Sequence, residues 1–488
     1  MSDLVSPVGS SYALRPQIRL SPMDLGERER MGAENDARTV LAYGKPLAAA
    51  LGREGAAFLR DALGSVLRIL PHTSVTKWKA RQSAGETRVK WVDNNRRAIS
   101  VNIQISVEDR PYCVSAEVSR RAAPSGVGHI KRTLDSREFD LCKRVADRIS
   151  DVLRAAPLGG SSASLRAIQS VFDQHVVAAH LQQHHGIHFE LAVVLAEFRR
   201  LAERSYESKS LSFGLLIEEG KNEADCVFPS DFFSKKRYRA LSDGYKTAFV
   251  VNSYGRLEGL RDLSQFSPGA SEQHFYPEWC EKIAEASAAG ACGIALTRQG
   301  DILIFDSGNL RFTCRSGQWQ YWNHSHVCDL FRNTARVQRV PIKVVPQVVR
   351  AIYRVALDVS FRRSGALFVL LRNRKNKARL VVPGDGIGDA KREPLHALFD
   401  ETLTKARVQT MSRAVLAELA SIDGGVVMDN QGFLLAYGAV LKTSGRFNPS
   451  EGSRTKAAVS ASHWGISVKV SSDGDIVFFA DGNPFLEL

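Results

Sequence analysis

Long apolar runs are missing from this chain of 488 residues. No stretch approaches the ~20 consecutive apolar residues that a membrane-spanning helix needs. The first residues, MSDLVSPVGSS, also lack the charged and apolar regions of a secretory signal. The composition, 44% hydrophobic and 24% charged, is that of an ordinary globular protein, and the length allows two or three domains. We therefore expect a cytoplasmic protein with no membrane partner.

Paired cysteines are missing as well. The chain has seven cysteines, an odd number, and no two of them form a Cys-x-x-Cys pair. This pattern argues against a disulfide framework and against a zinc ribbon, and it fits a reducing compartment in which the thiols are isolated and buried. The sequence also has no Gly-x-Ser-x-Gly elbow of a serine hydrolase.

Negative charge is in the minority, since 66 Lys and Arg stand against 52 Asp and Glu, a net charge of +14. The excess is spread along the chain, which favours polyanions such as nucleotides in general but indicates no particular groove. The densest run, Arg372–Arg379, lies between two apolar segments and is typical of a solvated hairpin loop. The glycines of Gly384–Gly388 lack the spacing and the Lys-Ser/Thr ending of a phosphate loop, so we interpret them as a flexible loop.

Changes of pattern along the chain divide it into parts. Polar, proline- and glycine-bearing residues predict a flexible N-terminal tail and, at Pro157–Ser164, a linker. A helix with one apolar face, Pro346–Ser360, leads into the last part. The expected fold class is a multi-domain mixture of α/β and α+β. The expected parts are a tail (1–35), a small α+β module (36–157), a linker (158–164), a second α+β domain (165–340) and a C-terminal α/β domain (341–488).

Five histidines gather at the end of one helix of the middle region. His180, His184 and His188 are four residues apart and would share one face of a continuous helix, as metal ligands can. Gly186, however, is expected to end the helix before His188, and no glutamate stands between the histidines as in a His-Glu-x-x-His motif. The other members of this cluster are His175 and His185. Two interpretations of the cluster remain, a metal site and a polar helix end.

The most specific chemistry lies between residues 411 and 479. A short amphipathic helix runs into the turn Asp423-Gly-Gly, where glycines let a ligand approach the backbone beside a lone carboxylate. Two β-runs follow, joined by a strong turn signal at Asp429–Gly432. After a polar loop, Ser453 and Arg454 stand at a helix start, where free N–H groups and the helix dipole favour an anion. A metal-binding acid and a phosphate cradle in one domain suit a nucleoside triphosphate.

The order of these motifs resembles the nucleotide-binding domain of bacterial diadenylate cyclases, the domain found in the DNA-integrity scanning protein. Members of that family carry Asp-Gly-Ala and, further on, Gly-Thr-Arg-His-Arg. The chain has Asp423-Gly424-Gly425 and Gly452-Ser453-Arg454-Thr455-Lys456 in these places. Upstream, Arg362–Leu371 resembles the first core strand of the family. The β-rich region before it, within 165–340, is similar to a sensor domain called DACNV.

The resemblance implies a fold, a ligand and a reaction. The fold is an α/β domain with a central mixed sheet flanked by helices. The reaction condenses two ATP molecules into cyclic di-AMP with release of pyrophosphate. Asp423 would hold Mg²⁺ or Mn²⁺, two copies of the domain would self-associate face to face, and the sensor-like domain would regulate that meeting. The implied catalytic residues are Asp423, Arg454 and Lys456, and the implied nucleotide-binding residues are Gly424, Gly425, Gly452, Ser453, Arg454, Thr455 and Ser471.

Two positions depart from the family pattern. Thr455 replaces a histidine and Lys456 replaces an arginine, so an imidazole and a bidentate guanidinium are lost. Loss of an aligned phosphate contact commonly costs roughly a few kcal/mol of transition-state stabilisation. The alternative is therefore a sensor that binds ATP or a cyclic dinucleotide without turnover. A nucleic-acid-binding protein is a third, weaker interpretation. The helical DNA-binding extension of the DNA-integrity scanning protein has no counterpart in this sequence, so we do not expect DNA scanning.

Overall fold

The computed structural model describes residues 45–488, except for 108–109, 122–132, 156–166, 204, 207–208, 211, 223–237, 239–240, 267–273, 390–399, 401 and 445–451. The tail (1–35) and the linker (158–164) expected from the sequence lie outside the described residues.

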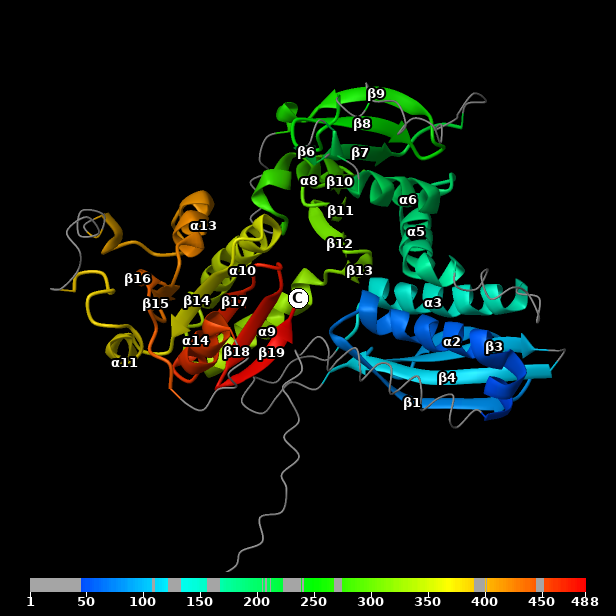
Figure 1. Cartoon of the computed structure of the whole chain (residues 1–488), viewed down its shortest axis with the longest axis horizontal. Coiled ribbons are helices and arrows are strands. Elements are labelled where there is room, and N and C mark those ends of the chain that lie inside the picture. The colour runs from blue at the N-terminus through cyan, green and yellow to red at the C-terminus, as the bar shows by residue number, and fades with distance from the viewer. Residues whose placement is uncertain are drawn as a thin grey trace, which may run out of the picture.

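The first module is a four-stranded antiparallel sheet with two helices (Figure 1). Its strands are β1 (Thr73–Gln82), β2 (Arg88–Trp91), β3 (Ala98–Val107) and β4 (Arg110–Arg120), in the order β1-β4-β3-β2. Its helices are α2 (Lys45–Ile69) and α3 (Ser136–Ala155). Burial alternates along most of β3, which is the pattern of a sheet with one face on a core.

The middle region places two helices before a seven-stranded sheet. Helix α5 (Phe172–His185) ends where Gly186 takes a φ of 60°, as expected, and α6 (Leu191–Ala202) follows. The sheet has the order β13-β12-β11-β10-β7-β8-β9, and its β7–β8 pair is parallel. Its strands are β7 (Phe213–Glu218), β8 (Thr247–Asn252), β9 (Leu257–Asp262), β10 (Cys292–Leu296), β11 (Ile302–Asp306), β12 (Asn309–Arg315) and β13 (Gln318–Tyr321). A separate small pair is β5 (Ser205–Tyr206) with β6 (Lys209–Ser210).

Two more helices and the edge strand of the sheet complete this region. Helix α8 (Glu281–Ala288) is only two turns long, and α9 (His324–Val337) follows it after the β10–β13 strands. Strand β9 lies at the edge of the sheet and is largely exposed, so its sequence has little of the apolar alternation that indicates a strand.

The C-terminal part is built on a six-stranded mixed sheet in the order β16-β15-β14-β17-β18-β19, in which β14 and β15 are parallel. The strands are β14 (Ala366–Leu371), β15 (Gly425–Met428), β16 (Leu434–Ala439), β17 (Gly465–Val470), β18 (Ile476–Ala480) and β19 (Asn483–Glu487). The helices are α10 (Val345–Arg362), α11 (Lys377–Leu380), α13 (Arg413–Ser421) and α14 (Ser453–Ser462), and the 3-10 turn η4 (Arg374–Asn376) precedes α11. The strand predicted over Arg362–Leu371 begins only at Ala366, because α10 continues to Arg362.

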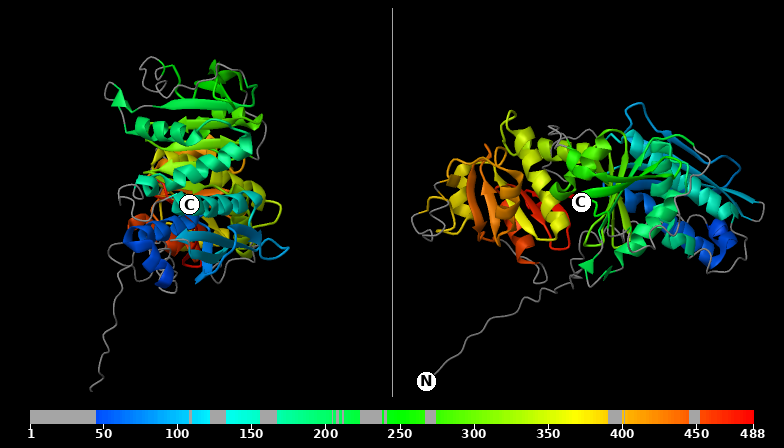
Figure 2. Two further views of the ribbon diagram at one scale, coloured as in Figure 1. Left: turned by 90° about the vertical axis from the view of Figure 1, so that its right-hand side faces the viewer. Right: turned by 90° about the horizontal axis from the view of Figure 1, so that it is seen from above.

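Three hydrophobic clusters join these parts. In the right-hand view of Figure 2, the yellow helix α10 lies between the orange and red C-terminal sheet and the green middle region. The first cluster unites the N-terminal module, α5, α6 and one face of the seven-stranded sheet. The second unites the other face of that sheet with α8, α9, α10, α13 and one face of the six-stranded sheet. The third lies among α11, α14 and the opposite face of the six-stranded sheet. Strand β14 is buried along its whole length because helices cover both of its faces. The C-terminal sheet is therefore packed against the middle region through α10.

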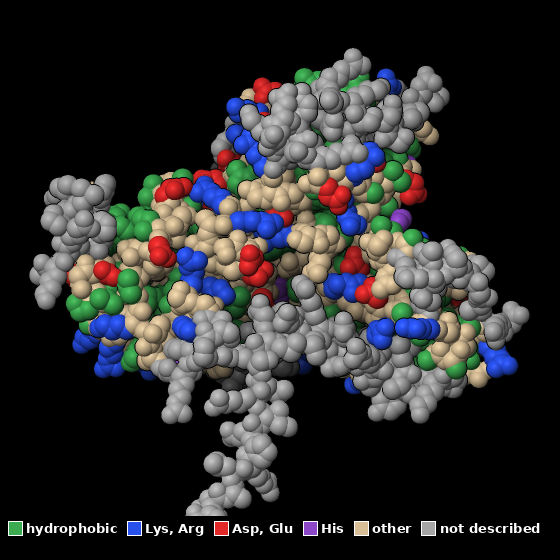
Figure 3. All heavy atoms as spheres, viewed as in Figure 1, with side chains coloured by type: hydrophobic (Ala, Val, Ile, Leu, Met, Phe, Trp, Pro, Cys, Tyr) green, Lys and Arg blue, Asp and Glu red, His purple; other side chains and the backbone are tan. Residues whose placement is uncertain are grey.

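The expected fold class, a multi-domain mixture of α/β and α+β, is confirmed. Among the described residues, no helix combines the length and apolar character needed to cross a membrane. Six of the seven cysteines lie in the described part of the chain and are buried free thiols, as expected. Basic and acidic side chains are interspersed on the face shown in Figure 3, in keeping with a spread of charge rather than one basic groove.

Candidate functional site

One edge of the C-terminal sheet brings together the ends of three strands. Strands β14 and β15 run parallel, with Phe368 opposite Val426, so their first residues meet at the same edge. Strand β17 runs the other way, with Val470 opposite Ala366, so its last residues reach that edge too. The turn Asp423-Gly-Gly enters β15 at this point, and the first turn of α14 lies beside it.

Asp423 and Arg454 meet at this edge. The Nη2 atom of Arg454 lies 3.5 Å from Oδ1 of Asp423, although 31 positions separate them in the chain. The Asp423 side chain is fully exposed (101%) and that of Arg454 is 34% exposed. An ion pair this open to water contributes little to stability. Both groups are therefore accessible to a ligand that carries negative charge and a metal ion.

Two glycines allow the backbone to come close to these side chains. Gly424 has a φ of 113°, and a Cβ atom there would lie 2.4 Å from the carbonyl carbon of Gly438 on β16. Gly365 has a φ of 31° just before β14, and a Cβ atom there would lie 2.2 Å from Nη1 of Arg454. The guanidinium of Arg454 thus occupies the space that a side chain at position 365 would fill. Gly365 is a site residue that the sequence analysis missed.

Helix α14 starts at the residues that the sequence indicated. Gly452 is the N-cap, and Ser453 is the first residue of the helix. The N–H groups of Thr455 and Lys456 both donate to the carbonyl oxygen of Gly452. The N–H groups of Ser453 and Arg454, the first two residues of the helix, have no carbonyl of their own helix to bond, and the helix dipole points its positive end here. Arg454 adds a formal charge to the same position.

The altered motif position Thr455 contacts a second cation. Its Oγ1 lies 3.0 Å from Nζ of Lys469, which donates to it from strand β17. Lys469 was not singled out from the sequence. The signal that indicates it is one lysine in an otherwise uncharged strand, Gly465–Val470. Lys456, on the same helix turn, is half-buried.

Ser471, one of the nucleotide-binding residues that the resemblance implies, closes the β17–β18 hairpin. Its hydroxyl oxygen accepts from the N–H of Asp475 at 3.0 Å, and its own N–H donates to the carbonyl oxygen of Asp475 at 2.9 Å. The hydroxyl is therefore already engaged within the turn.

The helix that leads into Asp423 is anchored by a buried ion pair. On α13, Arg413 donates through Nε and Nη2 to the two carboxylate oxygens of Asp358 on α10, at 2.6 and 2.7 Å. Asp358 is fully buried and also accepts from the N–H of Glu278, in the 3-10 turn η3 (Glu278–Cys280) of the middle region. Burial raises the pKa of the Asp358 carboxyl, and Arg413 opposes that effect. This pair fixes α13 to both α10 and the middle region.

A second buried carboxylate connects the middle region to the strand edge itself. Asp301, in the turn between β10 and β11, accepts from Nη2 of Arg363 at 2.8 Å and lies 3.6 Å from Nε of Arg315. Arg315 in turn donates to the carbonyl oxygen of Gly474, in the β17–β18 turn, at 3.1 Å. Residues on both sides of the edge, just before β14 and just after β17, are thus held by the middle region.

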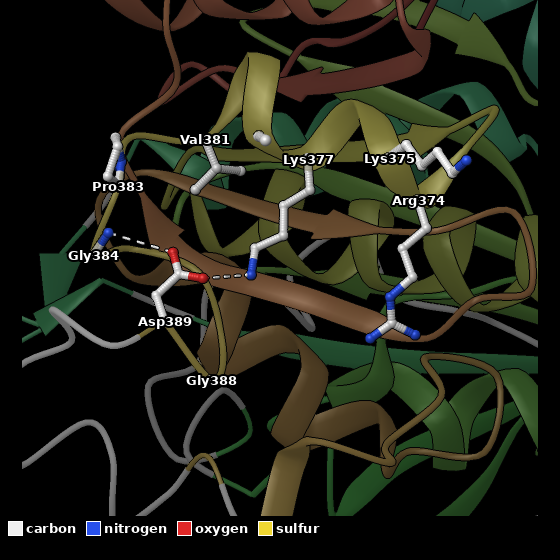
Figure 4. Close-up of a pocket in the computed structure, with 9 residues that line it drawn as sticks. Arg374, Lys375, Lys377, Val381, Pro383, Gly384, Gly388 and Asp389 are labelled. Carbon is white, nitrogen blue, oxygen red and sulfur yellow. Dashed lines mark hydrogen bonds and ion pairs between the residues drawn. The ribbon is translucent and has the colours of Figure 1, made fainter.

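A cavity of about 620 Å³ lies between α11 and the loop that follows it (Figure 4). Within that loop, the N–H groups of Gly384 and Gly386 donate to one carboxylate oxygen of Asp389, at 3.3 and 3.0 Å. Nζ of Lys377 lies 2.8 Å from the other oxygen. The loop interpreted above as flexible therefore folds around a carboxylate of its own. The basic run Arg372–Arg379, interpreted above as a hairpin loop, forms η4 and most of α11 instead.

The structure keeps only part of the expected histidine face. His180 and His184 stack on one another on α5, and His180 also bonds Asp140 on α3 at 2.7 Å. His188 lies beyond the helix end, where it stacks on Tyr254, and so does not share that face. His184 and His185 instead approach Asp306 at the end of β11. Spacing along the chain gave no sign of this partner, because it comes from another element.

No protein-family model matches this chain, and no curated protein matches it either. Among solved structures, a hypothetical membrane-spanning protein from Bacillus cereus is similar over 32% of this chain and 75% of its own chain. The sequence identity is 20% and the TM-score is 0.22. A TM-score of that size does not establish a shared fold. What the site does has to be argued from its own residues.

Proposed function

We propose that the C-terminal domain binds ATP with Mg²⁺ or Mn²⁺, and that two copies of it condense two ATP molecules into cyclic di-AMP and pyrophosphate. The observation that carries this proposal is the contact between Asp423 and Arg454, at 3.5 Å and open to solvent. An acid that suits a metal and a cation that suits phosphate lie within the span of one triphosphate. The resemblance to diadenylate cyclases rests on the same two motifs.

The donor set at the edge fits a magnesium or manganese ion that arrives with the nucleotide. Such an ion is commonly held by one or two carboxylates together with substrate phosphates, and Asp423 offers one exposed carboxylate. When bound, the ion would offset the charge that develops on the α-phosphate as pyrophosphate leaves. Arg454 presents a planar fork of N–H donors to phosphate oxygens, and the first N–H groups of α14 add to it.

A single domain offers one such site, whereas the proposed reaction joins two nucleotides. The 3′-hydroxyl of each ATP has to meet the α-phosphorus of the other, so a second copy of the chain is part of the proposal. Positioning supplies most of the catalysis in this reaction type. Asp301 of the middle region binds Arg363 just before β14, and Glu278 of the middle region binds Asp358 on α10. The middle region therefore directly contacts the elements that position the site. These contacts support a regulatory role for that region.

The test is incubation of the full chain with ATP and Mn²⁺, followed by separation of nucleotides and search for a cyclic dinucleotide. We expect product from the wild type and none above background from Asp423→Asn, which keeps the shape of the side chain and removes its charge. Asp329→Asn is the matched control, since Asp329 is an exposed acid on α9. Product from Asp423→Asn at the wild-type rate would contradict the proposal.

A second function, nucleotide binding without turnover, is favoured by one observation. The hydroxyl of Thr455 already accepts from Lys469 and offers no imidazole to a phosphate. Lys456 supplies a point charge rather than a bidentate fork. Tight ATP binding without any product would establish this function. In that case the double variant Thr455→His, Lys456→Arg should gain product, and its failure to do so would place the defect elsewhere in the site.

A further inference from the structure

Two histidines and an aspartate from different elements converge at the junction of α5 and the seven-stranded sheet. His184 and His185 are the last two residues of α5, and Asp306 is the last residue of β11. One potential ligand atom from each of the three side chains lies within 4.8 Å of the other two.

The distances among these atoms are close to those of a coordinated ion. The His184 Nε2 atom lies 3.5 Å from Oδ2 of Asp306, and the His185 Nε2 atom lies 3.6 Å from Oδ1. A tetrahedral zinc ion with bonds of about 2.0–2.1 Å separates its ligands by roughly 3.3–3.4 Å. Since one ligand atom from each of the three residues lies within 4.8 Å of the other two, shifts of roughly 1.5 Å or less would close the site around an ion.

A buried nitrogen without a partner provides a second observation. The side chain of His185 is 8% exposed, and its Nε2 atom makes no hydrogen bond within the described residues. Leaving such a polar atom buried and unpaired is costly. The nitrogen lies on the side of the ring that faces Asp306, which is itself almost fully buried. A metal ion at this position would satisfy it.

Arg137, at the start of α3, currently holds the position that an ion would take. Its Nη1 atom forms an ion pair with Oδ2 of Asp306, and its Nη2 atom lies 3.1 Å from Nε2 of His184. The guanidinium thus touches two of the three potential ligands. Its side chain is 20% exposed and that of His184 is 41% exposed, so the cluster opens to solvent on this side. Arg137 can leave toward solvent as an ion enters.

We propose that His184, His185 and Asp306 bind a divalent transition-metal ion, zinc being the best suited, and that the ion replaces the Arg137 guanidinium. Two imidazoles and one carboxylate are a ligand set that zinc favours, with a fourth position left for water or an external ligand. The ion would tie the end of α5 to β11. This site is independent of the proposed nucleotide site.

The experiment measures zinc binding by the full chain after treatment with a chelator, in competition with a chromophoric zinc indicator. We expect one saturable site in the wild type. His185→Ala should weaken binding by more than about 100-fold, because even groups that merely support a ligand contribute roughly 10- to 100-fold. His175→Ala, on the same helix but not among the three proposed ligands, should leave the affinity unchanged.

Arg137→Gln separates a metal site from a purely structural ion pair. If an ion replaces the guanidinium, removing this charge should strengthen zinc binding by about tenfold or more, since like charges repel strongly at this range. Cobalt should give the visible spectrum of a tetrahedral nitrogen–oxygen site without a thiolate band. Circular dichroism checks that each variant is folded. The proposal is overturned if the wild type shows no saturable site, if His185→Ala binds zinc as the wild type does, or if Arg137→Gln weakens binding.

Discussion

Replacing Gly365 by alanine tests whether the position of Arg454 matters for ligand binding. The added Cβ atom would lie 2.2 Å from Nη1 and 3.0 Å from Cζ of Arg454. Ordinary contact begins at 3.4 Å, so the guanidinium has to retreat by about 1.2 Å. Because this group is the end of a flexible side chain, it can retreat without disturbing the sheet. The substitution therefore moves the Arg454 guanidinium, which is proposed to bind phosphate, and leaves the surrounding fold in place.

The expected loss of affinity follows from the contact that is displaced. One hydrogen bond to a charged group contributes about 1.5–3 kcal/mol, so losing it should weaken ATP binding by roughly 10- to 150-fold. If the domain also turns over, a misplacement of about 1 Å should lower the rate by roughly 100-fold. The dissociation constant is measured by calorimetry with ATP and Mn²⁺. Because it needs only binding, this measurement applies to both proposed functions.

A matched glycine controls for backbone strain. Gly365 has a φ of 31° and Gly388, in the same domain, a φ of 75°, but a Cβ atom at Gly388 meets nothing within 4 Å. Both alanine variants should lose about 1–2 kcal/mol of stability from a backbone conformation that side chains disfavour. Only Gly365→Ala should lose affinity for ATP, and Arg454→Ala added to it should cost little more. ATP binding by Gly365→Ala equal to that of Gly388→Ala would refute the reasoning.

Three further predictions concern residues around the site and the core. Asp301→Asn removes the charge partner of Arg363 and should cost about 3 kcal/mol, seen as a lower urea midpoint than in the exposed control Asp329→Asn. Burial holds the pKa of His324 to about 3, against 6.5 in the unfolded chain, so the unfolded chain binds more protons below pH 6.5. His324 alone should therefore lower the stability by about 1 kcal/mol between pH 6.5 and 5.5, and His324→Gln should remove that part of the fall, measured by denaturation at each pH. Lys469→Met should weaken ATP binding by about tenfold with little change in melting temperature, and unchanged binding would remove Lys469 from the site.

Local pattern was enough to place most helices and strands. The apolar face of α10 and the uniformly apolar run of β14 predict which of their side chains are buried. This works because the side chains of one helix or strand turn toward the core at a fixed spacing along the chain. Gly186 ends α5 and Asp429–Gly432 joins β15 to β16, since turn chemistry depends on a few adjacent residues. Strand β9 shows the limit of this reasoning, because it is an exposed edge strand and its sequence carries no such pattern.

The sequence by itself named Asp423 and Arg454 but left the distance between them open. Their contact depends on the strand order, in which β14 lies between β15 and β17 and brings three strand ends to one edge. The histidine cluster shows the same limit, since Asp306 comes from a strand far from α5 in the chain. The sequence pattern also does not show that Gly365 lies against the Arg454 guanidinium. Pairing between distant segments is set by packing of the whole core, which periodicity within one segment does not encode.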